Sequence, residues 1–440
     1  MQNTASGPYS GGNVYLRSLA FVVHDMDWWL VAATAFLLFV GLSTLQHQGS
    51  NFADKQFQFL IAGAVAALAF WRIPYSFWTH KIALPILYVI NIVLLIAVMV
   101  KGHSALGAQR WLALGPITLQ PSEIAKLVVI FTLAAWLGRR PIKSFWDCFK
   151  AIGLIAIPAV LVFKQPDLGT SLTFGAVYTG MIFWAGAGVT DLIILLSPVI
   201  TLIANAFSSE ATSPMGTHGW LIWIGGLGLW LLGTWRIREF KLPIRVLLII
   251  AILLANVGAG YERPKMWGLL KEYQQKRLTS FLNPYIDPRG SGYHILQSLI
   301  AIGSGGMQGT GLGKGNQSQG AFIPERHTDF IFSVVGEELG FRFSALVIFS
   351  YAIICLRAIA IAYQSREEPC GSLMAIGFMC MYLFHVFLNI GMTMGIMPVA
   401  GVPLPFLSYG GTALIIDMIG IGILNSIRLI NPPPRKDIWK

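Results

Sequence analysis

Long apolar runs alternate with short polar segments along almost the whole chain. An α-helix needs ~20 mostly apolar residues to cross the hydrocarbon core of a bilayer, so each long run predicts one membrane span. The pattern predicts about twelve spans, at 28–46, 56–72, 82–100, 122–138, 150–164, 168–185, 191–206, 219–235, 244–260, 328–352, 372–392 and 408–430. We therefore predict an all-α, polytopic membrane protein.

The composition agrees with this prediction and narrows the function classes. The 440 residues are 55% hydrophobic and 12% charged, whereas soluble domains carry about 25% charged residues. The net charge of +11 is explained by basic cytoplasmic loops, so we expect no nucleic-acid partner. The four cysteines form no C-x-x-C pair, and we expect neither a disulfide framework nor a zinc site.

Basic residues gather in alternate loops and so predict the orientation. With the N-terminus inside, loop 207–218 lies outside and contains no Lys or Arg. The inside segments contain Arg139, Arg140, Lys143, Lys150, Arg236, Arg238, Lys241, Arg245, Arg435, Lys436 and Lys440. Because positive charge favours the cytoplasmic side, we predict a multi-pass membrane protein with both termini in the cytoplasm. Its segments 1–27 and 431–440 are then a cytoplasmic N-terminal segment and a cytoplasmic tail.

One predicted outside segment, residues 261–327, is long and rich in basic residues. Long loops are exempt from the charge rule, so the orientation stands. The charges either face water or meet an anionic partner such as a lipid phosphate. Within it, near-helical spacing of apolar residues predicts an amphipathic helix. That helix either lies on the membrane surface or packs on the rest of the protein. The residues are Trp267, Leu270, Tyr273, Leu278 and Phe281.

An acid and a base are carried into the predicted span 122–138. Pro121 and Ser122 are typical of a helix start, with Ser122 as a cap, and Glu123 follows in the first turn. Lys126 lies three residues later, so both charged side chains project from one face of the helix. The alternatives are a lysine that snorkels to the surface and a cation in a polar cavity held by Glu123.

The stretch PERHTDF, residues 324–330, crowds charged residues at the start of the span 328–352. Thr328 can cap that helix, and Asp329 then falls in its first turn, where it complements the helix dipole. However, Asp329 and Lys126 enter the membrane from the same side. We therefore predict that they pair in one outward-facing cavity.

Four further polar inserts fall on that same predicted side. Irregular backbone at membrane depth is tolerated where it lines a cavity or is buried in protein, so we expect the inserts to converge. They are KGHSALGAQRW (101–111), KQPDLGTS (164–171), SGYHILQS (291–298) and the Pro/Gly-broken segment 395–411. The candidate site residues that they and their flanks supply are Arg110, Gln120, Gln165, Asp167, Gln297, Arg326, His327 and Ser408.

The stretch GTGLGKG, residues 309–315, does not fit the phosphate-binding loop that it suggests. That pattern requires Gly at the position of Gln308 and Ser or Thr at that of Gly315. We expect these glycines to permit tight backbone turns instead.

Four long motifs occur in order along the chain: GAQRWLALGPITLQPSEIAK, KQPDLGTSL, the stretch from GYHILQS to FSVVGEELG, and MPVAGVPLPFLSYGG. They resemble the SEDS family (shape, elongation, division, sporulation) of bacterial cell-wall polymerases, over about 28–430. Arg326 makes the chain more similar to the elongation branch, RodA, than to the division branch, FtsW, where Ala is usual at this position. The resemblance implies a ten-helix core, which leaves an extra transmembrane hairpin within 207–258.

What the resemblance implies is a peptidoglycan glycosyltransferase, a multi-pass protein of the bacterial cytoplasmic (inner) membrane. It would polymerise lipid II into a growing glycan strand at the outer face of that membrane, during elongation and rod-shape maintenance. Its partners would be a class B penicillin-binding protein, the elongation machinery and membrane lipids. Asp329 matches the residue essential for polymerisation, and we assign it as general base of an inverting displacement. Lys126, Arg110 and Arg326 would stabilise the leaving pyrophosphate. No metal site is readable, although a divalent cation, Mg²⁺ or Mn²⁺, could accompany the pyrophosphate.

Three alternatives stay open. A lipid II flippase or transporter also has many spans, but it should expose polar residues on both sides of the midplane. An FtsW-type division polymerase would use the same motifs. A scaffold that only positions a transpeptidase would have no need of Asp329 or Lys126.

Overall fold

The computed structural model describes residues 26–49, 51–105, 108–114, 117–140, 142, 145–208, 224–228, 242–261, 275, 277, 280–281, 283–285, 288, 290, 292–320 and 322–431. The chain divides into two compact units. The larger contains Met1–Ile142, Trp146–Ala185 and His294–Lys440, and the smaller contains Lys143–Phe145 and Gly186–Tyr293.

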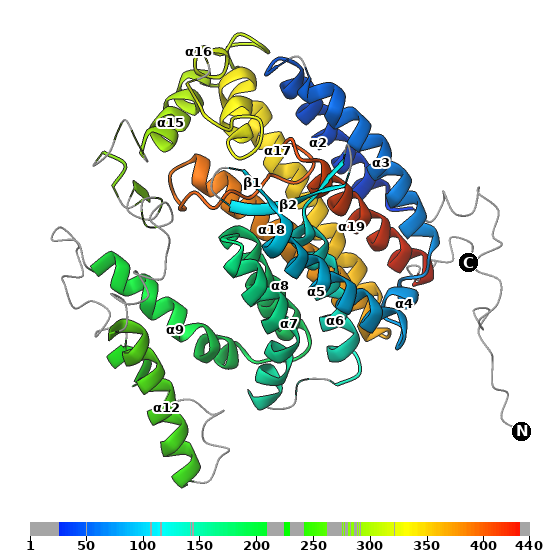
Figure 1. Cartoon of the computed structure of the whole chain (residues 1–440), viewed down its shortest axis with the longest axis vertical. Coiled ribbons are helices and arrows are strands. Elements are labelled where there is room, and N and C mark those ends of the chain that lie inside the picture. Colours follow the sequence, from blue (N-terminus) through cyan, green and yellow to red (C-terminus); the bar gives the residue numbers. More distant parts are fainter. Residues whose placement is uncertain are drawn as a thin grey trace, which may run out of the picture. The chain divides into compact units, whose positions relative to one another are not determined.

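Helices dominate the larger unit (Figure 1). They are α2 (Trp28–Gln46), α3 (Phe52–Arg72), α4 (Tyr75–Trp78), α5 (Ala83–Lys101), α6 (Pro121–Leu137), α7 (Phe145–Lys164), α8 (Leu168–Trp184), α15 (Tyr293–Gly305), α16 (Asn316–Gln319), α17 (Ile331–Gln364), α18 (Pro369–Thr393) and α19 (Gly411–Ile430). In the described part of the chain, six helices are long and apolar enough to cross a membrane. The prediction of a polytopic helical membrane protein is confirmed, while the count of twelve spans and the orientation stay predictions.

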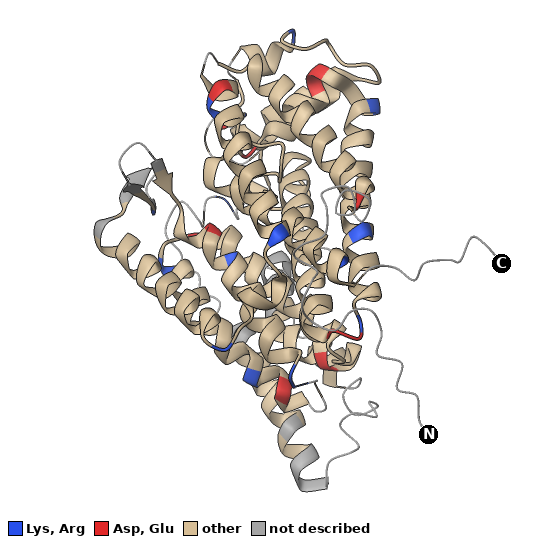
Figure 2. Ribbon diagram, turned by 90° about the vertical axis from the view of Figure 1, so that its right-hand side faces the viewer, with Lys and Arg blue, Asp and Glu red and all other residues tan. Residues whose placement is uncertain are grey.

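Small residues allow the helices of the larger unit to approach closely. Helix α19 packs against α3, and α17 packs against α18. A Cβ atom at Gly422 of α19 would collide with the carbonyl of Ala67 on α3, and one at Gly63 would lie 3.1 Å from the side chain of Met418. Such small residues are typical of membrane helix interfaces, where packing rather than the hydrophobic effect drives association. Figure 2 shows how sparsely charged residues are spread over the ribbon.

A small antiparallel sheet interrupts the all-α pattern between α5 and α6. Its strands are β1 (His103–Ala105), β2 (Ala108–Leu114) and β3 (Ile117–Leu119), in the order β1-β2-β3. The sequence analysis did not predict these strands. The strands are short, and they are joined by backbone pairing, such as that of Leu112 with Leu119. Strands this short show too little alternation of apolar and polar residues to be predicted from the sequence.

The glycine-rich stretch after α15 turns tightly, as predicted. Gly306, Gly309, Gly311 and Gly313 all have positive φ, which glycine adopts without steric cost. A Cβ atom at Gly309 would collide with the carbonyl of Glu338 on α17. Helix α17 itself breaks at Gly340, where φ is 74°. Gly340 packs against the backbone of Gly309, so this contact is made between two glycines.

The segment between α18 and α19 is irregular and largely buried, as predicted for 395–411. Leu404, Phe406, Leu407 and Ser408 are each at most 4% exposed. The hydroxyl of Tyr351 on α17 donates to the carbonyl of Pro405 at 2.5 Å. Irregular backbone at this depth is therefore enclosed by protein.

In the smaller unit, α9 (Val189–Ser208) packs against α12 (Leu242–Tyr261). Asn256 of α12 donates to the hydroxyl of Ser197 at 2.9 Å and accepts from that of Thr201 at 2.5 Å. The predicted hairpin 207–258 lies partly outside the described residues, since within it only 207–208, 224–228 and 242–258 are described. The predicted amphipathic helix around Trp267–Phe281 also lies largely outside them.

Candidate functional site

The PERHTDF stretch forms a compact turn before α17 rather than the first turn of the helix. The amides of Thr328, Asp329 and Phe330 all donate to the carbonyl of Glu325, whose φ is 50°. Helix α17 begins at Ile331 with Phe330 as its N-cap and no side-chain cap bond. The predicted cap at Thr328 is therefore wrong, because the Thr328 hydroxyl bonds back to Glu325.

Three successive carbonyls of this turn are held by other elements. The His327 carbonyl accepts from the Tyr409 amide at 2.8 Å, and the Thr328 carbonyl accepts from the Ser408 hydroxyl at 2.6 Å. The Asp329 carbonyl accepts from the side-chain amide of Asn389 at 2.9 Å. The backbone that carries the half-buried Asp329 side chain is thus fixed at consecutive residues.

Two amide side chains that support this arrangement were not predicted. Asn389 of α18 also donates to the carbonyl of Val402 at 2.8 Å, so it joins the turn to the irregular segment. Gln56 of α3 donates to the Ser408 carbonyl at 3.0 Å and accepts from the Gly410 amide at 3.2 Å. Both are buried in predicted membrane helices, where a polar side chain is costly. A polar residue inside a predicted span is therefore the feature of the sequence that could have identified them.

His327 is stacked in a small aromatic group. Its ring centroid lies 4.2 Å from that of Phe52 and 5.9 Å from that of Tyr409. Burial lowers the pKa of His327 below its usual range; the Glu325 carboxylate opposes this and the Arg326 charge adds to it. The imidazole is therefore neutral at pH 7.

Two buried carboxylates near the start of α17, Glu337 and Glu338, anchor the loop that carries α16. Glu337 accepts from the amides of Gln317 and Ser318 at 2.8 Å each, and Glu338 accepts from the Ser318 hydroxyl at 2.9 Å. Glu338 also interacts electrostatically with Arg326. The Nη1 atom of Arg326 is buried and makes no hydrogen bond within the described part of the chain.

Asp167 joins two of the predicted inserts, 101–111 and 164–171, to the start of α6. As N-cap of α8 it accepts from the amide and hydroxyl of Thr170, and it accepts from the hydroxyl of Ser122 at 3.0 Å. Gln120 donates to it at 3.3 Å, and Nη1 of Arg110 lies 4.0 Å from its Oδ1. The predicted cap at Ser122 is wrong, since the N-cap of α6 is Gln120 and Ser122 bonds to Asp167 instead.

Glu123 and Lys126 form the predicted pair on α6. Nζ of Lys126 lies 2.7 Å from Oε2 of Glu123, and Lys126 is 2% exposed, which excludes a snorkelling side chain. Among the described residues, Lys126 forms its ion pair with Glu123. No ion pair joins Lys126 to Asp329 in that part of the chain.

Two further predicted site residues lie apart from this group of contacts. Gln165 is buried and donates to the carbonyl of Leu95 on α5 at 2.8 Å, which is a packing bond between helices. Gln297 is half-buried on α15. Its neighbour Ser298 bonds to the hydroxyl of Ser333 at 2.5 Å and the carbonyl of Thr393 at 2.6 Å.

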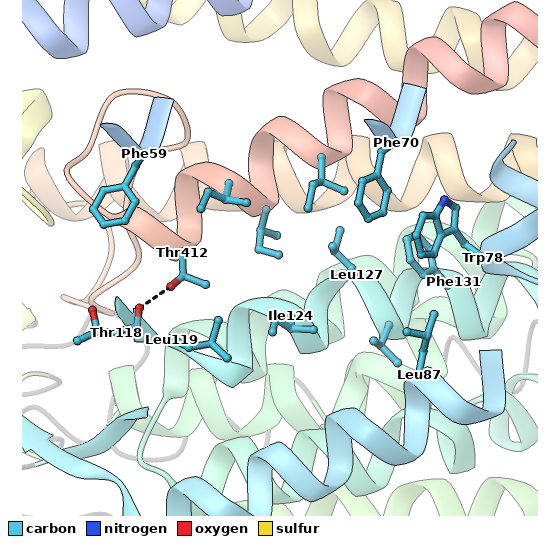
Figure 3. A pocket seen from close by; sticks show the side chains of 14 residues that line it. Phe59, Phe70, Trp78, Leu87, Thr118, Leu119, Ile124, Leu127, Phe131 and Thr412 are labelled. Carbon is cyan, nitrogen blue, oxygen red and sulfur yellow. Dashed lines mark hydrogen bonds between the residues drawn. The ribbon is translucent and has the colours of Figure 1, made fainter. Parts of the chain in front are cut away.

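An apolar pocket of about 300 Å³ lies between α3, α5, α6 and α19 (Figure 3). At one end Thr412 donates to the carbonyl of Thr118 at 3.2 Å. The remaining lining is Phe59, Phe70, Trp78, Leu87, Leu119, Ile124, Leu127, Val128, Phe131, Ile415, Ile416 and Ile419. Such a lining suits a hydrocarbon chain and has few groups that could bind a polar ligand.

No cluster of three or more His, Cys, Asp and Glu side chains that could hold a metal ion occurs among the described residues. The predicted divalent cation would therefore need the substrate's own phosphates as ligands.

Comparisons with known proteins place these features in a family. The family model for FtsW, RodA and SpoVE, described as "Cell cycle protein", matches residues 25–215 and 214–431. The peptidoglycan glycosyltransferase MrdB of Escherichia coli (strain K12) is 35% identical over 92% of this chain and 94% of its own. The peptidoglycan glycosyltransferase RodA of Treponema pallidum (strain Nichols) is 32% identical over 92% of this chain and 98% of its own.

Solved structures agree in fold. A chain from a peptidoglycan synthase complex that coordinates polymerization and crosslinking has a TM-score of 0.65 at 28% identity, covering 93% of this chain and 99% of that one. The rod shape determining protein RodA of Thermus thermophilus has a TM-score of 0.59 at 24% identity, covering 93% and 98%. The chain is thus a multi-pass protein of the bacterial inner membrane, and it belongs to the SEDS (FtsW/RodA/SpoVE) family.

Proposed function

We propose that this protein is a peptidoglycan glycosyltransferase of the elongation type that polymerises lipid II at the outer face of the membrane. Family membership and the names of the similar proteins support the activity. The observation that carries the role of Asp329 is the fixation of three successive carbonyls, from His327 to Asp329. Catalysis by a positioned carboxylate requires that the backbone carrying it be held rigidly.

In the proposed reaction, a sugar 4-hydroxyl of one substrate attacks the anomeric carbon of the other. The bond from that carbon to the polyprenyl pyrophosphate breaks, and the hydroxyl proton passes to the Asp329 carboxylate. A single displacement with one base and no covalent intermediate inverts the anomeric configuration. The stacked, neutral His327 shapes the wall beside Asp329 rather than adding a charge.

Cationic groups near the site would stabilise the leaving pyrophosphate. Nε of Arg110 and Nη1 of Arg326 are buried donors without a hydrogen-bond partner in the described residues, so each can donate to a phosphate oxygen. Asp167 holds Arg110 in place. Lys126, whose ammonium is paired with Glu123, contributes its charge from greater depth.

The apolar pocket suits the polyprenyl chain of such a substrate. Its lining side chains Ile124 and Leu127 alternate on α6 with Glu123 and Lys126. A hydrocarbon chain in the pocket would therefore lie beside the charged face of the same helix. A class B penicillin-binding protein is the partner we propose, supported by the similarity to a chain of a synthase complex that couples polymerization to crosslinking.

Polymerisation of lipid II by the purified chain in detergent tests the proposal. The wild-type protein should make glycan strands, alone or with its transpeptidase, while Asp329→Asn binds lipid II and makes none. Glu325→Gln is the matched control, because it removes a carboxylate from the same turn and should keep activity. A transporter or scaffold would give no polymer with any variant, and normal strands from Asp329→Asn would exclude it as the base.

Two additions to that assay test the supporting roles. Lys126→Met should polymerise more slowly than wild type, and an unchanged rate would remove Lys126 from the mechanism. Chelation of divalent cations, followed by addition of Mg²⁺ or Mn²⁺, should abolish and then restore polymerisation if a cation bridges the pyrophosphate.

A further inference from the structure

Three aromatic side chains from separate parts of the chain contact one another at the turn that carries the proposed base. The His327 ring is stacked on that of Phe52, the first residue of α3, with an interplanar angle of 22°. The Phe52 ring meets that of Tyr409 edge to face, with centroids 5.1 Å apart. All three residues are partly exposed, and the side chain of His327 is 24% exposed. Rings that only filled the core would be enclosed, so this group presents an aromatic surface.

Hydrogen bonds of the surrounding backbone fix where the three rings lie. The Tyr409 amide donates to the His327 carbonyl at 2.8 Å. Gln56, one turn after Phe52 on α3, bonds to the carbonyl of the residue before Tyr409 and to the amide of the residue after it. The first turn of α3, the turn at His327 and the segment at Tyr409 are therefore joined to one another independently of the rings.

The rim of this aromatic group carries polar atoms that can still form hydrogen bonds. Within the described part of the chain, neither the Tyr409 hydroxyl nor the ring nitrogens of His327 make one, and Nε2 of His327 lies 3.9 Å from Oε2 of Glu325. A pyranose ring has faces made of C–H bonds and a rim of hydroxyl groups. Its faces pack on the faces of aromatic rings, and its rim needs polar partners. The group offers both kinds of contact.

The same part of α3 also forms one end of the apolar pocket. Phe59, two turns after Phe52, lines the pocket, and a Cβ atom at Gly411 would lie 2.5 Å from its ring. Figure 3 shows Phe59 at the end of the pocket where Thr412 bonds to Thr118. A ligand that joins a sugar to a hydrocarbon chain would thus meet both contacts within the first two turns of α3.

We propose that Phe52, His327 and Tyr409 form an aromatic platform on which the sugar ring that carries the attacking hydroxyl is stacked. This inference rests on the proposed function and adds to it the residues that bind the acceptor sugar. His327 lies two residues before Asp329, and the carbonyls of both are held in the same turn. A sugar on the platform therefore has its rim beside the proposed base. Phe52 and Tyr409 bind the sugar and take no proton.

Steady-state polymerisation of lipid II by the purified full chain tests the platform. Phe52→Leu and Tyr409→Leu each remove a ring and keep an apolar side chain. Each should raise KM on the order of tenfold with little change in kcat, because a stacked ring binds substrate and transition state alike. Phe52→Trp and Tyr409→Phe retain a ring and should restore most of the wild-type KM.

Phe57→Leu is the matched control for these variants. Phe57 lies on the same helix and is 54% exposed, but it is not part of the platform, so its loss should leave KM unchanged. An unchanged KM in Phe52→Leu and Tyr409→Leu would overturn the proposal. So would a KM that rises equally in the variants that lose a ring and in those that keep one.

Binding of a soluble sugar separates this inference from the proposed function. Chitotetraose, an oligomer of N-acetylglucosamine, is a glycan without lipid or peptide, and saturation-transfer-difference NMR detects its contacts with the detergent-solubilised protein. The wild-type protein should transfer saturation to the C–H protons of the sugar, and Phe52→Leu and Tyr409→Leu should lose most of that transfer. If no protein polymerises lipid II while the transfer depends on the rings, the proposed function fails and the platform stands. If polymerisation is normal while neither KM nor the transfer depends on the rings, the platform fails and the function stands.

Discussion

The side-chain amide of Asn389 donates to the backbone carbonyl of Asp329 at 2.9 Å and, from the same nitrogen, to the carbonyl of Val402 at 2.8 Å. One buried side chain of α18 therefore connects the turn that carries the proposed base to the irregular segment before α19. We expect Asn389→Ala to free both carbonyls and to lower lipid II polymerisation roughly 10- to 100-fold, since a small misplacement of a catalytic group is costly.

The control for this prediction is Asn425→Ala. Asn425 is also a buried amide in a membrane helix, but it accepts from the Asp27 amide far from the turn. It should cost stability with little loss of rate per folded molecule. Equal activity of Asn389→Ala and wild type would show that the turn is held without this bond.

The stability of the His327 region should depend on pH. Because burial lowers the pKa of His327 in the folded state, the unfolded state takes up the proton first as pH falls below ~6.5. Above that pH, titration of His327 should not affect the wild-type Tm. Below it, the wild-type Tm should decline as pH falls, until the pH drops below the pKa of His327 in the folded state. His327→Phe keeps the stack on Phe52 and cannot be protonated, so its Tm should decline less between about pH 6.5 and 5. Parallel Tm curves would contradict this assignment.

An ion cluster at the start of α2 should contribute to global stability. The fully buried Asp27 carboxylate accepts from Nε and Nη2 of Arg357 at 2.9 and 2.7 Å, and it also pairs with Arg428. Asp27→Asn leaves two arginines without their acid and should cost about 3 kcal/mol, the low end for a broken buried pair, because both arginines retain some solvent contact. Denaturation of the purified protein measures this.

Lys150→Met is the comparison for Asp27→Asn. Lys150 pairs with Asp147 at 2.8 Å, but its side chain is 63% exposed. This change should cost only ~0–1 kcal/mol. Similar losses for the two variants would mean that the Asp27 cluster behaves as a surface pair.

The contact between the glycine-rich segment 306–315 and α17 should tolerate no side chain at Gly309. Its φ is 81°, and a Cβ atom there would collide with the Glu338 carbonyl. Gly306 also has a positive φ, 51°, but faces open space. Gly306→Ala should therefore cost ~1–2 kcal/mol for the backbone conformation alone, and Gly309→Ala should cost more and also slow polymerisation. Equal Tm losses would show that the loop moves away from α17 freely.

The sequence was sufficient to predict features that are determined by residues close together in the chain. The apolar run 28–46 coincides with α2 because membrane burial needs a continuous apolar helix. Glu123 and Lys126 pair as predicted because three residues on a helix place them on one face. The strands β1 to β3 escaped prediction, since their pairing joins short segments with weak alternation.

The contacts that could not be predicted join residues far apart in the chain. The sequence suggested that Lys126 would pair with Asp329 as well as with Glu123, but its ion pair within the described residues is with Glu123. Which of several acids lies near a buried lysine depends on how α6, α18 and α19 cross. A single Asp or Asn inside an otherwise apolar span is a usable signal nonetheless, and Asp417 and Asn389 both carry it.

The three held carbonyls also bear on how the protein is made. The turn at His327–Asp329 takes its bonds from Asn389, Ser408 and Tyr409, which are synthesised 60 to 82 residues after the residues they hold. When Asp329 leaves the ribosome, none of these partners exists. The proposed base can reach its final position only after the segment before the last helix has been inserted. A nascent or truncated chain that displays Asp329 at the membrane surface is therefore unable to start a glycan strand prematurely.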